Sequence, residues 1–491
     1  MNNNAIRSVN AVPRVIVIGA GITGLSAAHR LSELCAEHGF PLEVTVLEGR
    51  DRPGGVISTR ESEGFTVEEG PDSFLRTKPE AVGLSSRVGL APLLVGTNKE
   101  ADKAFVLKNG RLVPMPAGLF PGPPRMTALF GSPLLSIGGK LRMLLEAFIP
   151  GSASEGDESA ASFMRRRFGR EAYEYLVEPL LSGIYAGDPA TLSVRTALPM
   201  LAKMEQEYGS VTRGMRRNGA FPGAPKNGGE AGGRFAAFDR GMGTLVNALY
   251  SRMPEGTVRL RSRVKRIDAM GGGFRVHLNG AAPMDCDAVI VALPAPGAAL
   301  VTQGLDLELS LDLSRIKYVS NVVINLAYTK SEVPHRLDGS GFLVPSSERL
   351  PLLACTFSSV KFRGRSPDDA VLFRGVAGGV RNPGICGEED GRLVDIAHGA
   401  LSPILGIKSA PVFGMVSRNP ESTPHYAVGH GELVARINER AGRFPSLRLA
   451  GNAYGGAGIP DCVRSGEEAA GEIFRYVTER EAKYEGRKSC G

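Results

Sequence analysis

Tryptophan is absent from this 491-residue sequence, and aromatic residues as a whole make up only 6% of it. The two densest basic runs, residues 164–170 and 259–266, contain a single aromatic side chain between them, that of Phe168. Proteins that bind single-stranded nucleic acid need aromatic rings on which the bases stack. We therefore interpret both runs as solvated faces and expect no nucleic acid among the partners, despite a net charge of +7.

Cysteine and histidine are also sparse. The six cysteines contain no C-x-x-C pair, and the seven histidines show no H-E-x-x-H or comparable spacing of metal ligands. Scattered cysteines of this kind are typical of a reduced compartment, where disulfides do not persist. We expect no metal site.

The sequence offers neither a secretory signal nor a strong candidate for a membrane span. Its first twelve residues have no charged region followed by an apolar one. Residues 288–305 form an uncharged run at the lower length limit for a spanning helix, but Pro294, Pro296 and Gly297 divide it. We predict there a buried strand that ends in a turn, and we expect a cytoplasmic protein with at most peripheral membrane contact.

Glycine, by contrast, is abundant at 63 residues, and hydrophobic residues, at 42%, suffice for a large core. Residues 14–18 are largely apolar, as in a parallel strand buried on both faces, and residues 22–35 follow with a helical pattern. A second strand ends at Glu48. Residues 286–294 and 446–458 predict two further buried strands, so we expect a sheet assembled from distant segments.

The loop between the first strand and the helix reads GAGITG, with the G-x-G-x-x-G spacing at Gly19, Gly21 and Gly24. In such loops the first glycine makes the sharp turn, the second admits a pyrophosphate, and the third lets helix and strand pack closely. The helix N-terminus adds partial positive charge. Glu48 stands where an acid binds the ribose hydroxyls, so this unit predicts a dinucleotide-binding fold.

A second glycine turn follows the acid. Arg52 precedes Gly54 and Gly55, and this pair lets backbone run against a long, fixed cofactor. An enzyme that binds NAD would not need the second turn. The sequence therefore favours a dinucleotide other than NAD.

These motifs resemble the amine-oxidase superfamily of FAD proteins, whose N-terminal pattern is G-x-G-x-x-G, an acid and then R-x-G-G. Further segments resemble its porphyrinogen-oxidising branch, the protoporphyrinogen and coproporphyrinogen III oxidases, and above all the Gram-positive coproporphyrinogen III oxidase type. SGIYAGD, within residues 180–193, is the most specific piece, because amine oxidases and carotene desaturases do not carry it. The other segments are EEGPDSFLRTKPEA at 68–81, FDRGMGTLVNAL at 238–249, GFLVP at 341–345, HYAVGH at 425–430 and GNAYGGAGIPDCVRSGEEAA at 451–470.

The expected fold is α/β and multidomain. It combines a Rossmann-like FAD-binding domain built from discontinuous segments, a mixed-sheet substrate domain and a mainly helical domain, which corresponds to the part that attaches some relatives to membranes. A Gly- and Pro-rich stretch is predicted to be a loop or linker. The predicted boundaries are 12–80, 235–300 and 440–480 for FAD, 301–439 for substrate, 81–215 for the helices and 216–234 for the linker.

By position, the resemblance implies FAD contacts in widely separated segments. A helix that starts near Asp461 would direct its N-terminal amides at the flavin ring. The implied contacts are Gly19, Ala20, Gly21, Ile22, Thr23, Gly24, Glu48, Gly49, Arg52, Gly54, Gly55, Val56, Gly70, Pro71, Asp72, Ser73, Val264, Ala457, Gly458 and Ile459.

The reaction that the resemblance implies is the oxidation of a porphyrinogen to the porphyrin, in haem biosynthesis. Flavin takes a hydride and dioxygen reoxidises it to give hydrogen peroxide, so the protein mainly orients a ring carbon against the flavin. Coproporphyrinogen III is the expected substrate, protoporphyrinogen IX is the alternative, and a downstream ferrochelatase is a candidate partner. An amine oxidase or desaturase, and a flavin-binding porphyrin carrier without turnover, are the other functions left open.

Coproporphyrinogen carries four propionates and protoporphyrinogen two, so the former calls for more cations. Arg76 and Lys78 follow an implied FAD-contacting loop, as in the Gram-positive enzymes, and we assign both to the substrate site, with Lys78 as the catalytic candidate. A solvated lysine at a helix start is the alternative. Ala104 stands where plant-type protoporphyrinogen oxidases have a propionate-binding Arg.

The sequence departs from the family pattern near its C-terminal third. Asn419 and His425 stand where related enzymes usually show a Trp and a Gln. We include His425 among the substrate-binding candidates, and a satisfied structural histidine is the alternative for both His425 and His430. The departure bears on the substrate and not on the flavin.

Overall fold

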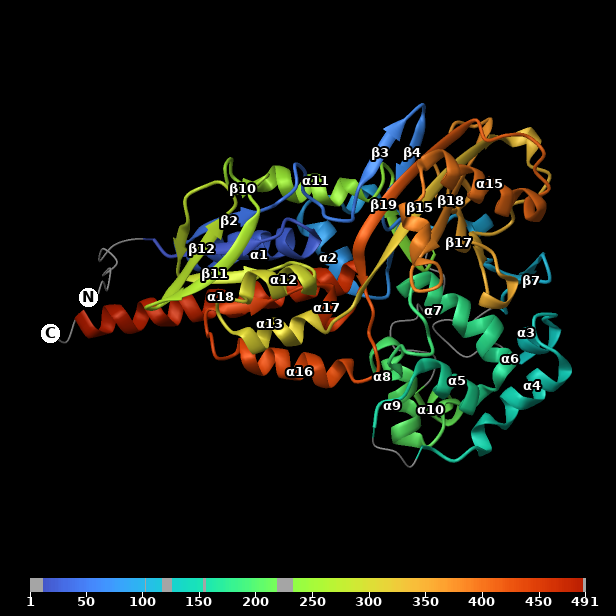
Figure 1. Cartoon of the computed structure of the whole chain (residues 1–491), viewed down its shortest axis with the longest axis horizontal. Helices are drawn as coiled ribbons and strands as arrows, with labels where there is room; N and C mark the ends of the chain where they lie inside the picture. The colour runs from blue at the N-terminus through green and yellow to red at the C-terminus, as the bar shows by residue number, and fades with distance from the viewer. Residues whose placement is uncertain (1–11, 102, 117–125, 153–155, 219–232, 489–491) are drawn as a thin grey trace.

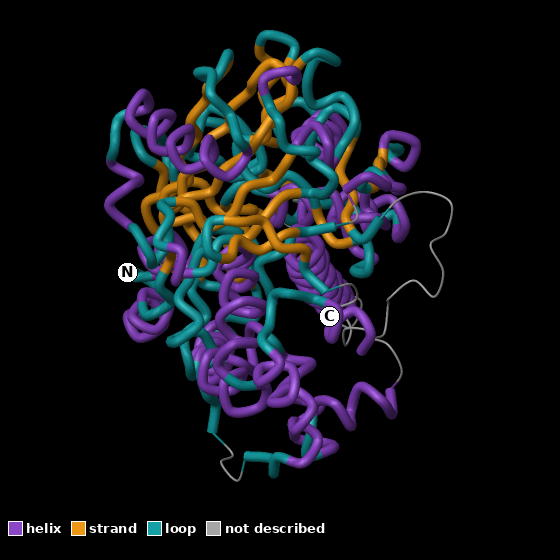
Figure 2. Tube along the Cα trace, turned by 90° about the vertical axis from the view of Figure 1, so that its right-hand side faces the viewer, coloured by secondary structure: helices purple, strands orange, loops and turns teal. Residues whose placement is uncertain are grey.

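The computed structural model describes residues 12–101, 103–116, 126–152, 156–218 and 233–488. Figure 1 shows three parts: a parallel sheet with its helices, a larger mixed sheet, and a body of short helices below the larger sheet. After a quarter turn, Figure 2 again separates most strands above from the helical body below. The predicted α/β multidomain fold is confirmed.

A five-stranded parallel sheet forms the core of the first part, in the order β10-β2-β1-β14-β20. Val15 and Val17 of β1 pack into one hydrophobic core, and Ile16 and Ile18 pack into another on the opposite face. Burial on both faces explains the apolar run. The prediction of a sheet assembled from distant segments is confirmed: β1 is Arg14–Ile18, β2 Glu43–Leu47, β10 Val258–Arg259, β14 Ala288–Val291 and β20 Leu447–Leu449.

Both faces of this sheet are covered (Figure 1). One face carries α1 (Ile22–His38), α2 (Pro79–Arg87), α11 (Gly243–Arg252) and α18 (Ile459–Lys488). The other carries an antiparallel sheet of β11 (Val264–Met270), β12 (Gly273–Leu278) and β13 (Met284–Cys286), with α12 (Ala295–Thr302), α13 (Leu307–Ser314) and α16 (His430–Ala441).

The buried strand predicted within residues 288–305 is present as β14 and ends in a bend at residues 292–294, but the helix that follows was not predicted. Helix α12 begins there at Ala295, and Pro296 lies in its first turn. Proline is tolerated in that turn because the first amides of a helix have no intrahelical partner to lose.

The second part is a seven-stranded sheet in the order β19-β15-β18-β17-β16-β7-β8, antiparallel except for the β16–β7 pair. Helix α15 (Asp390–Leu405) packs against it. The hairpin β7–β8 comes from residues 81–215, so that stretch contributes to this sheet as well as to the helices. The strands are β7 Phe105–Lys108, β8 Arg111–Pro114, β15 Tyr318–Thr329, β16 Gly341–Leu343, β17 Leu352–Phe357, β18 Ala370–Gly378 and β19 Phe413–Pro424.

Two small sheets connect the larger parts. One pairs β3 (Thr59–Ser62) with β4 (Phe65–Glu68), and Figure 1 places this hairpin beside β19. The other has the order β5-β9-β6. Its strands are β5 Phe74–Leu75, β6 Leu94–Gly96 and β9 Phe235–Phe238.

The helical body has its own hydrophobic core, in which Phe163, Leu176 and Met204 are buried. Among the described residues, no helix combines the length and apolar character that crossing a bilayer requires. Residues 219–232 of the predicted linker lie outside the described residues. The helices are α3 Met126–Gly131, α4 Ile137–Leu144, α5 Ala160–Phe168, α6 Arg170–Ala172, α7 Glu178–Tyr185, α8 Val194–Ala197, α9 Pro199–Tyr208 and α10 Val211–Asn218.

Candidate cofactor and substrate site

The loop between β1 and α1 leaves space beside one glycine and none beside the other two. Gly19 has a φ of +103°, and a Cβ on Gly24 would come within 1.9 Å of the Gly19 carbonyl oxygen. A Cβ on Gly21 would meet no described atom within 4 Å. No described side chain caps α1 by a hydrogen bond, and its first turn carries no acid. The loop therefore offers the free volume and helix amides that hold a phosphate.

Glu48 follows the end of β2, beside this loop. Its Oε2 accepts a hydrogen bond from the Ala20 backbone N–H, and its Oε1 accepts one from the Arg50 backbone N–H, both at 2.8 Å. The side chain is buried, so these bonds hold the carboxylate in one orientation. Gly49 comes next and packs against Arg263, the residue before β11. The predicted Glu48, Gly49 and Val264 thus lie on one side of the loop.

The second glycine turn packs directly against the first. The Gly54 N–H donates to the Ala20 carbonyl at 2.7 Å, and a Cβ on Gly55 would lie 3.4 Å from the Cα of Gly21. Gly54 has a φ of +100°, which favours glycine. The Arg52 guanidinium binds the carbonyl oxygens of residues 53 and 57, at 3.2 and 3.4 Å, and so braces the turn.

Residues 68–73, which we call the flavin-side segment, form the next backbone layer. The Glu69 N–H donates to the Ser58 carbonyl at 2.9 Å. A Cβ on Gly70 would come within 1.9 Å of the Val56 carbonyl oxygen, so only glycine allows this approach. The loop at 19–24, the turn at 54–56 and the flavin-side segment therefore form three successive backbone layers.

Asp72 is an ionised group of the flavin-side segment. Its Oδ2 lies 2.8 Å from the Lys361 Nζ, and its Oδ1 accepts a hydrogen bond from the Ser73 hydroxyl at 2.8 Å. Burial alone would raise the pKa of the Asp72 carboxyl. The charges of Lys361 and Arg374 outweigh burial and hold this pKa well below its ordinary value. Asp72 is therefore ionised at neutral pH.

Helix α18 brings the last predicted segment, residues 457–459, close to the glycine loop at residues 19–24. A Cβ on Gly466 would come within 2.3 Å of the Thr23 carbonyl oxygen, so α18 and α1 are in backbone contact. Both helices follow strands of one parallel sheet and run in the same direction. Residues 457–459 precede Gly466 in the chain, so they lie past the N-terminal end of α1, on the side of the glycine loop. Asp461 lies in the first turn of α18 and offsets part of the positive charge of that helix end.

Lys78, the predicted catalytic residue, immediately precedes α2 and binds Asp461. Its Nζ lies 2.7 and 2.6 Å from the two carboxylate oxygens, and its side chain is 42% exposed. Arg464 also binds Asp461, at 3.0 Å, and Glu80, at 3.1 Å. Lys78 thus stands near the start of α18, but it shares Asp461 with a second cation. Its substrate role stays a prediction.

The other two predicted substrate residues lie elsewhere. Arg76 follows β5, and its backbone N–H donates to the Arg234 carbonyl at 3.1 Å. His425 follows β19 and is buried, with its Nε2 2.9 Å from the Thr191 hydroxyl. Burial lowers the pKa of His425, although Asp188 opposes the shift. The Nε2 contact fits the structural alternative, but the buried Nδ1 of His425 has no hydrogen-bond partner among the described residues, so the ring is only half satisfied. The substrate roles of His425 and Arg76 stay predictions.

Three residues near the flavin-side segment were not predicted from the sequence, Asn325, Lys361 and Arg374, and Asn419 was noted only as a departure from the family pattern. Their side chains reach this segment from the larger sheet and from the short helix α14 (Ser358–Lys361). One signal was available. The strand sequence NVVIN places Asn321 and Asn325 four residues apart, hence on one face, among apolar neighbours.

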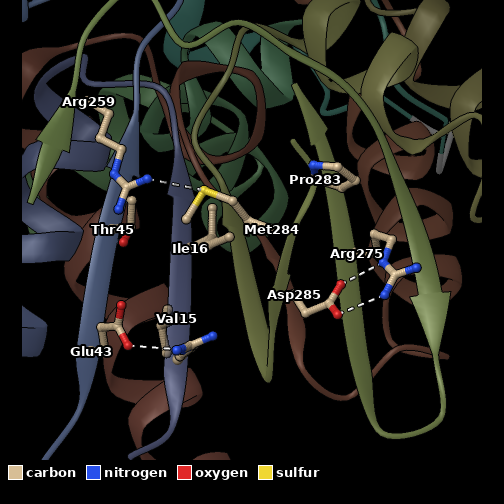
Figure 3. Close-up of a pocket in the computed structure, with 10 residues that line it drawn as sticks. Val15, Ile16, Glu43, Thr45, Arg259, Arg275, Pro283, Met284 and Asp285 are labelled. Carbon is tan, nitrogen blue, oxygen red and sulfur yellow. Dashed lines mark hydrogen bonds and ion pairs between the residues drawn. The ribbon is translucent and has the colours of Figure 1, made fainter. Parts of the chain in front are cut away.

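A separate cleft of about 620 Å³ lies between β1, β2 and the β12–β13 hairpin (Figure 3). Four of the five charged residues at this cleft pair with each other: Arg14 with Glu43 at 2.9 Å, and Arg275 with Asp285 at 2.7 Å. The fifth, Arg259, contacts the Met284 sulfur at 3.8 Å. Arg14 and Glu43 begin their strands, whereas ligands of open parallel sheets bind beyond the carboxyl ends. We therefore place the candidate site at the glycine loop and not at this cleft.

The parallel sheet, the open glycine loop and the acid after β2 define the class of dinucleotide-binding proteins. Residues 22–474 match the family described as flavin containing amine oxidoreductase. Because this match spans most of the chain, the protein belongs to that family. The predicted superfamily is confirmed.

Relatives of known name match nearly the whole chain. Coproporphyrinogen III oxidase of Bacillus subtilis (strain 168) is 32% identical, over 94% of this chain and 98% of the relative. Coproporphyrinogen III oxidase of Staphylococcus aureus is 30% identical over the same shares. Protoporphyrinogen oxidase 1, chloroplastic, of Arabidopsis thaliana is also 30% identical, over 94% of this chain and 88% of the relative. The similarity to both kinds of porphyrinogen oxidase confirms the suspected resemblance.

Solved structures agree on the fold. A protein from Exiguobacterium sp. 255-15, provisionally assigned as a protoporphyrinogen oxidase, superposes with a TM-score of 0.81 at 29% identity, covering 94% of this chain and 99% of its own. Reduced UDP-galactopyranose mutase has a TM-score of 0.71 at 17% identity, covering 95% and 96%, and shares the fold alone.

FAD is the cofactor, as predicted, and the residues present fit it. Gly21 has open space where a pyrophosphate needs room, and the α1 amides face that space without an acid in their turn. Glu48 is fixed beside the loop for the ribose. The turn at 54–56 and the flavin-side segment continue the path away from the loop. The individual contacts remain predictions.

Proposed function

We propose that the protein is an FAD-dependent oxidase that converts coproporphyrinogen III to coproporphyrin III in haem biosynthesis, reducing dioxygen to hydrogen peroxide. The observation that carries this proposal is the similarity to the Bacillus subtilis coproporphyrinogen III oxidase across 94% of the chain. The product would pass to a ferrochelatase.

FAD held by the glycine loop and Glu48 would supply a hydride acceptor for the porphyrinogen, and dioxygen would take up each electron pair as one hydrogen peroxide. The chain itself supplies binding and orientation. The glycine loop and Glu48 hold the adenosine half, and the flavin-side segment fixes the backbone farther along the cofactor path. The oxidation gains macrocycle aromaticity, so correct placement of the ring carbon suffices and no strong general base is required.

Substrate choice depends on the propionates. Lys78 and Arg76 lie in the chain just after the flavin-side segment, and Lys78 contacts the start of α18 through Asp461. A propionate that displaces the Asp461 carboxylate from Lys78 would replace one charge-assisted bond with another. Similarity to Arabidopsis protoporphyrinogen oxidase 1 supports protoporphyrinogen IX as the second candidate substrate.

A rate comparison on the two porphyrinogens tests the function. Porphyrin fluorescence and hydrogen peroxide are measured in parallel at matched substrate concentrations. We expect faster turnover of coproporphyrinogen III, with peroxide formed in step. Faster turnover of protoporphyrinogen IX would transfer the function to the second candidate, and a yellow protein that oxidises neither would indicate a carrier.

The cofactor assignment has its own test. Gly21→Val places a branched side chain in the open space of the loop without a clash in the protein itself. We expect a folded variant that purifies without most of its FAD, measured by flavin absorbance per protein. The matched control is Gly391→Val, at another open position, on α15, and should keep its flavin. Full FAD occupancy in Gly21→Val would refute the phosphate role of this loop.

We also propose that the protein is cytoplasmic and touches membranes only at their surface. Ile137 and Phe148, in and just after α4, are 77% and 79% exposed, and Leu141 and Leu145 on the same face are about half exposed. Vesicle sedimentation tests this contact. Wild-type protein should sediment partly with the vesicles, and a variant with Ile137→Ser and Phe148→Ser should not; equal behaviour of both would reject the contact.

A further inference from the structure

The flavin-side segment is held by side chains of the larger sheet. The Asn325 Nδ2 donates to the carbonyl oxygen of residue 68 at 3.2 Å, and the Asn419 Nδ2 donates to that of residue 69 at 3.0 Å. The Arg374 Nη2 donates to the carbonyl oxygen of residue 70 at 2.5 Å. Three consecutive carbonyls are therefore bound by three side chains that lie 257 to 350 residues farther along the chain.

The three donors share one face of the sheet. Asn325 on β15 is directly opposite Arg374 on β18. Asn419 on β19 is directly opposite Asn321 on β15, four residues before Asn325. Because side chains alternate along a strand, all of these residues point to the same side. Three adjacent strands thus present a row of hydrogen-bond donors to one backbone.

Lys361 extends this row. Its Nζ lies 2.8 Å from the Asp72 Oδ2 and donates to the Ser73 hydroxyl oxygen at 3.0 Å, and the lysine is 8% exposed. Every contact in the set runs from a donor on the substrate side to an acceptor on the flavin side. Residues 68, 69, 70, 72 and 73 are each held in this way.

Burying these polar groups costs stability wherever their hydrogen bonds are left unmade. Asn325 is 1% exposed, and its Oδ1 has no hydrogen-bond partner within the described chain. The buried Nε of Arg374 also has none among the described residues. An apolar strand position would avoid both deficits. The hydrogen bonds that Asn325 and Arg374 donate to the backbone of residues 68 and 70 offset this cost.

We propose that Asn325, Arg374, Asn419 and Lys361 are positioning residues, which we term the carbonyl clamp. The clamp sets the flavin-side segment, and through it the flavin ring, at a fixed distance from the substrate sheet. Hydride transfer requires the reacting atoms within about 3–3.5 Å, so a small shift of this segment slows the reaction while FAD remains bound. The inference rests on the flavin reaction of the proposed function.

The test compares Arg374→Met and Asn419→Leu with Arg374→Lys, which keeps a donor and a charge. Arg418→Met is the control, because Arg418 lies next to Asn419 on the opposite face of β19 and binds Asp390 instead. For each holoenzyme we would record the flavin absorption spectrum, the reduction potential, amide hydrogen exchange of residues 68–75, and kcat and KM.

We expect kcat to fall about tenfold in Arg374→Met with little change in KM, because the clamp acts on placement and not on substrate affinity. The flavin reduction potential and the amide hydrogen exchange of residues 68–75 should also shift in Arg374→Met. Arg374→Lys should restore most of both properties, and Arg418→Met should match wild type. If Arg374→Met does not fold, Asn419→Leu decides. A wild-type spectrum, potential and exchange in the decisive variant would overturn the clamp, and these readouts need no porphyrinogen, so a wrong substrate cannot imitate that result.

Discussion

The helical body buries charged groups, and so does the contact between residues 68–73 and the larger sheet with α14, which we call the joint. The two regions differ in the partners that these groups bind. In the helical body, Arg167 and Glu146 are fully buried and form an ion pair, with Glu205 3.4 Å from the same arginine. Glu146 also accepts hydrogen bonds from the hydroxyl of Ser210 and from the backbone N–H groups of residues 211 and 212. Burial would raise the pKa of Glu146, but these bonds outweigh it and lower the pKa.

At the joint, the charges hold residues 68–73 to another part of the fold. Arg374 binds the backbone of this segment and Lys361 binds the Asp72 side chain, and buried atoms of Arg374 and Asn325 have no partner among the described residues. The helical cluster pairs its charges within the helical body, although the buried Nε of Arg167 has no partner among the described residues. The two regions differ in what the buried groups hold: at the joint, side chains of the larger sheet and of α14 bind residues 68–73, which fits a role in placement.

The largest effect on stability is expected at Glu146. Glu146→Gln leaves the buried Arg167 with Glu205, 3.4 Å away, as its remaining carboxylate. We therefore expect a loss at the lower end of the about 3–5 kcal/mol that removing one partner of a buried ion pair costs. Urea unfolding followed by circular dichroism would measure the loss. Glu207→Gln, which breaks an exposed pair with Lys203, is the control and should cost less than about 1 kcal/mol. A flavin spectrum altered by Glu146→Gln would contradict the view that the helical cluster affects stability and not cofactor placement.

A smaller loss, about 2 kcal/mol at neutral pH, is expected for Lys361→Met, which removes the charged hydrogen bonds that Lys361 donates to Asp72 and to the Ser73 hydroxyl. The lysine and Arg374 depress the pKa of Asp72 in the folded state, so this stabilisation is present above the unfolded pKa, near 4, and is lost as pH falls below it. The gap between wild type and variant should therefore narrow below pH 4. An unchanged gap would mean that Asp72 is not the group concerned.

The contact between His425 and Thr191 should have a modest effect that depends on pH. Burial lowers the pKa of His425 in the folded state, so the unfolded chain binds a proton first as pH falls below about 6.5. Its contribution to stability is full above that pH and declines below it. His425→Asn should flatten thermal stability between pH 7 and 5, by less than about 1.4 kcal/mol per pH unit. A parallel decline in both proteins would instead implicate His430, whose pKa burial also lowers.

The smallest change in stability is expected for Lys78→Met. The pair with Asp461 is partly exposed on the lysine side, and such pairs contribute less than about 1 kcal/mol. Arg464 still binds Asp461 in the variant. If Lys78 binds a propionate, the KM for coproporphyrinogen III should rise several-fold with an unchanged melting temperature. Unchanged kinetics would reject the substrate role and leave Lys78 as a solvated lysine at a helix start.

The flavin half of the site could be predicted from the sequence because each of its requirements is local. Gly19 needs a positive φ, and Gly24 has no room for a Cβ. The acid follows the next strand at a fixed distance. Helix α12 was missed, because Pro296 was taken only as a break although the first turn of a helix accepts proline.

The substrate half could not be predicted in the same way. Asn325, Arg374 and Asn419 are unremarkable polar residues within strands, and their partners lie more than 250 residues away. Lys78 and His425 were singled out by resemblance, and the structure engages them with Asp461 and Thr191. Single positions do not encode such pairings, since side-chain contacts across domains depend on how the two sheets dock.

By itself, the sequence determined that the chain folds around a dinucleotide through glycine turns and an acid, because backbone sterics and helix amides act over a few neighbouring residues. Only the tertiary structure decided which side chains hold residues 68–73. Strand register and domain docking bring those donors to three consecutive carbonyls, and both arise from long-range packing that no short segment contains.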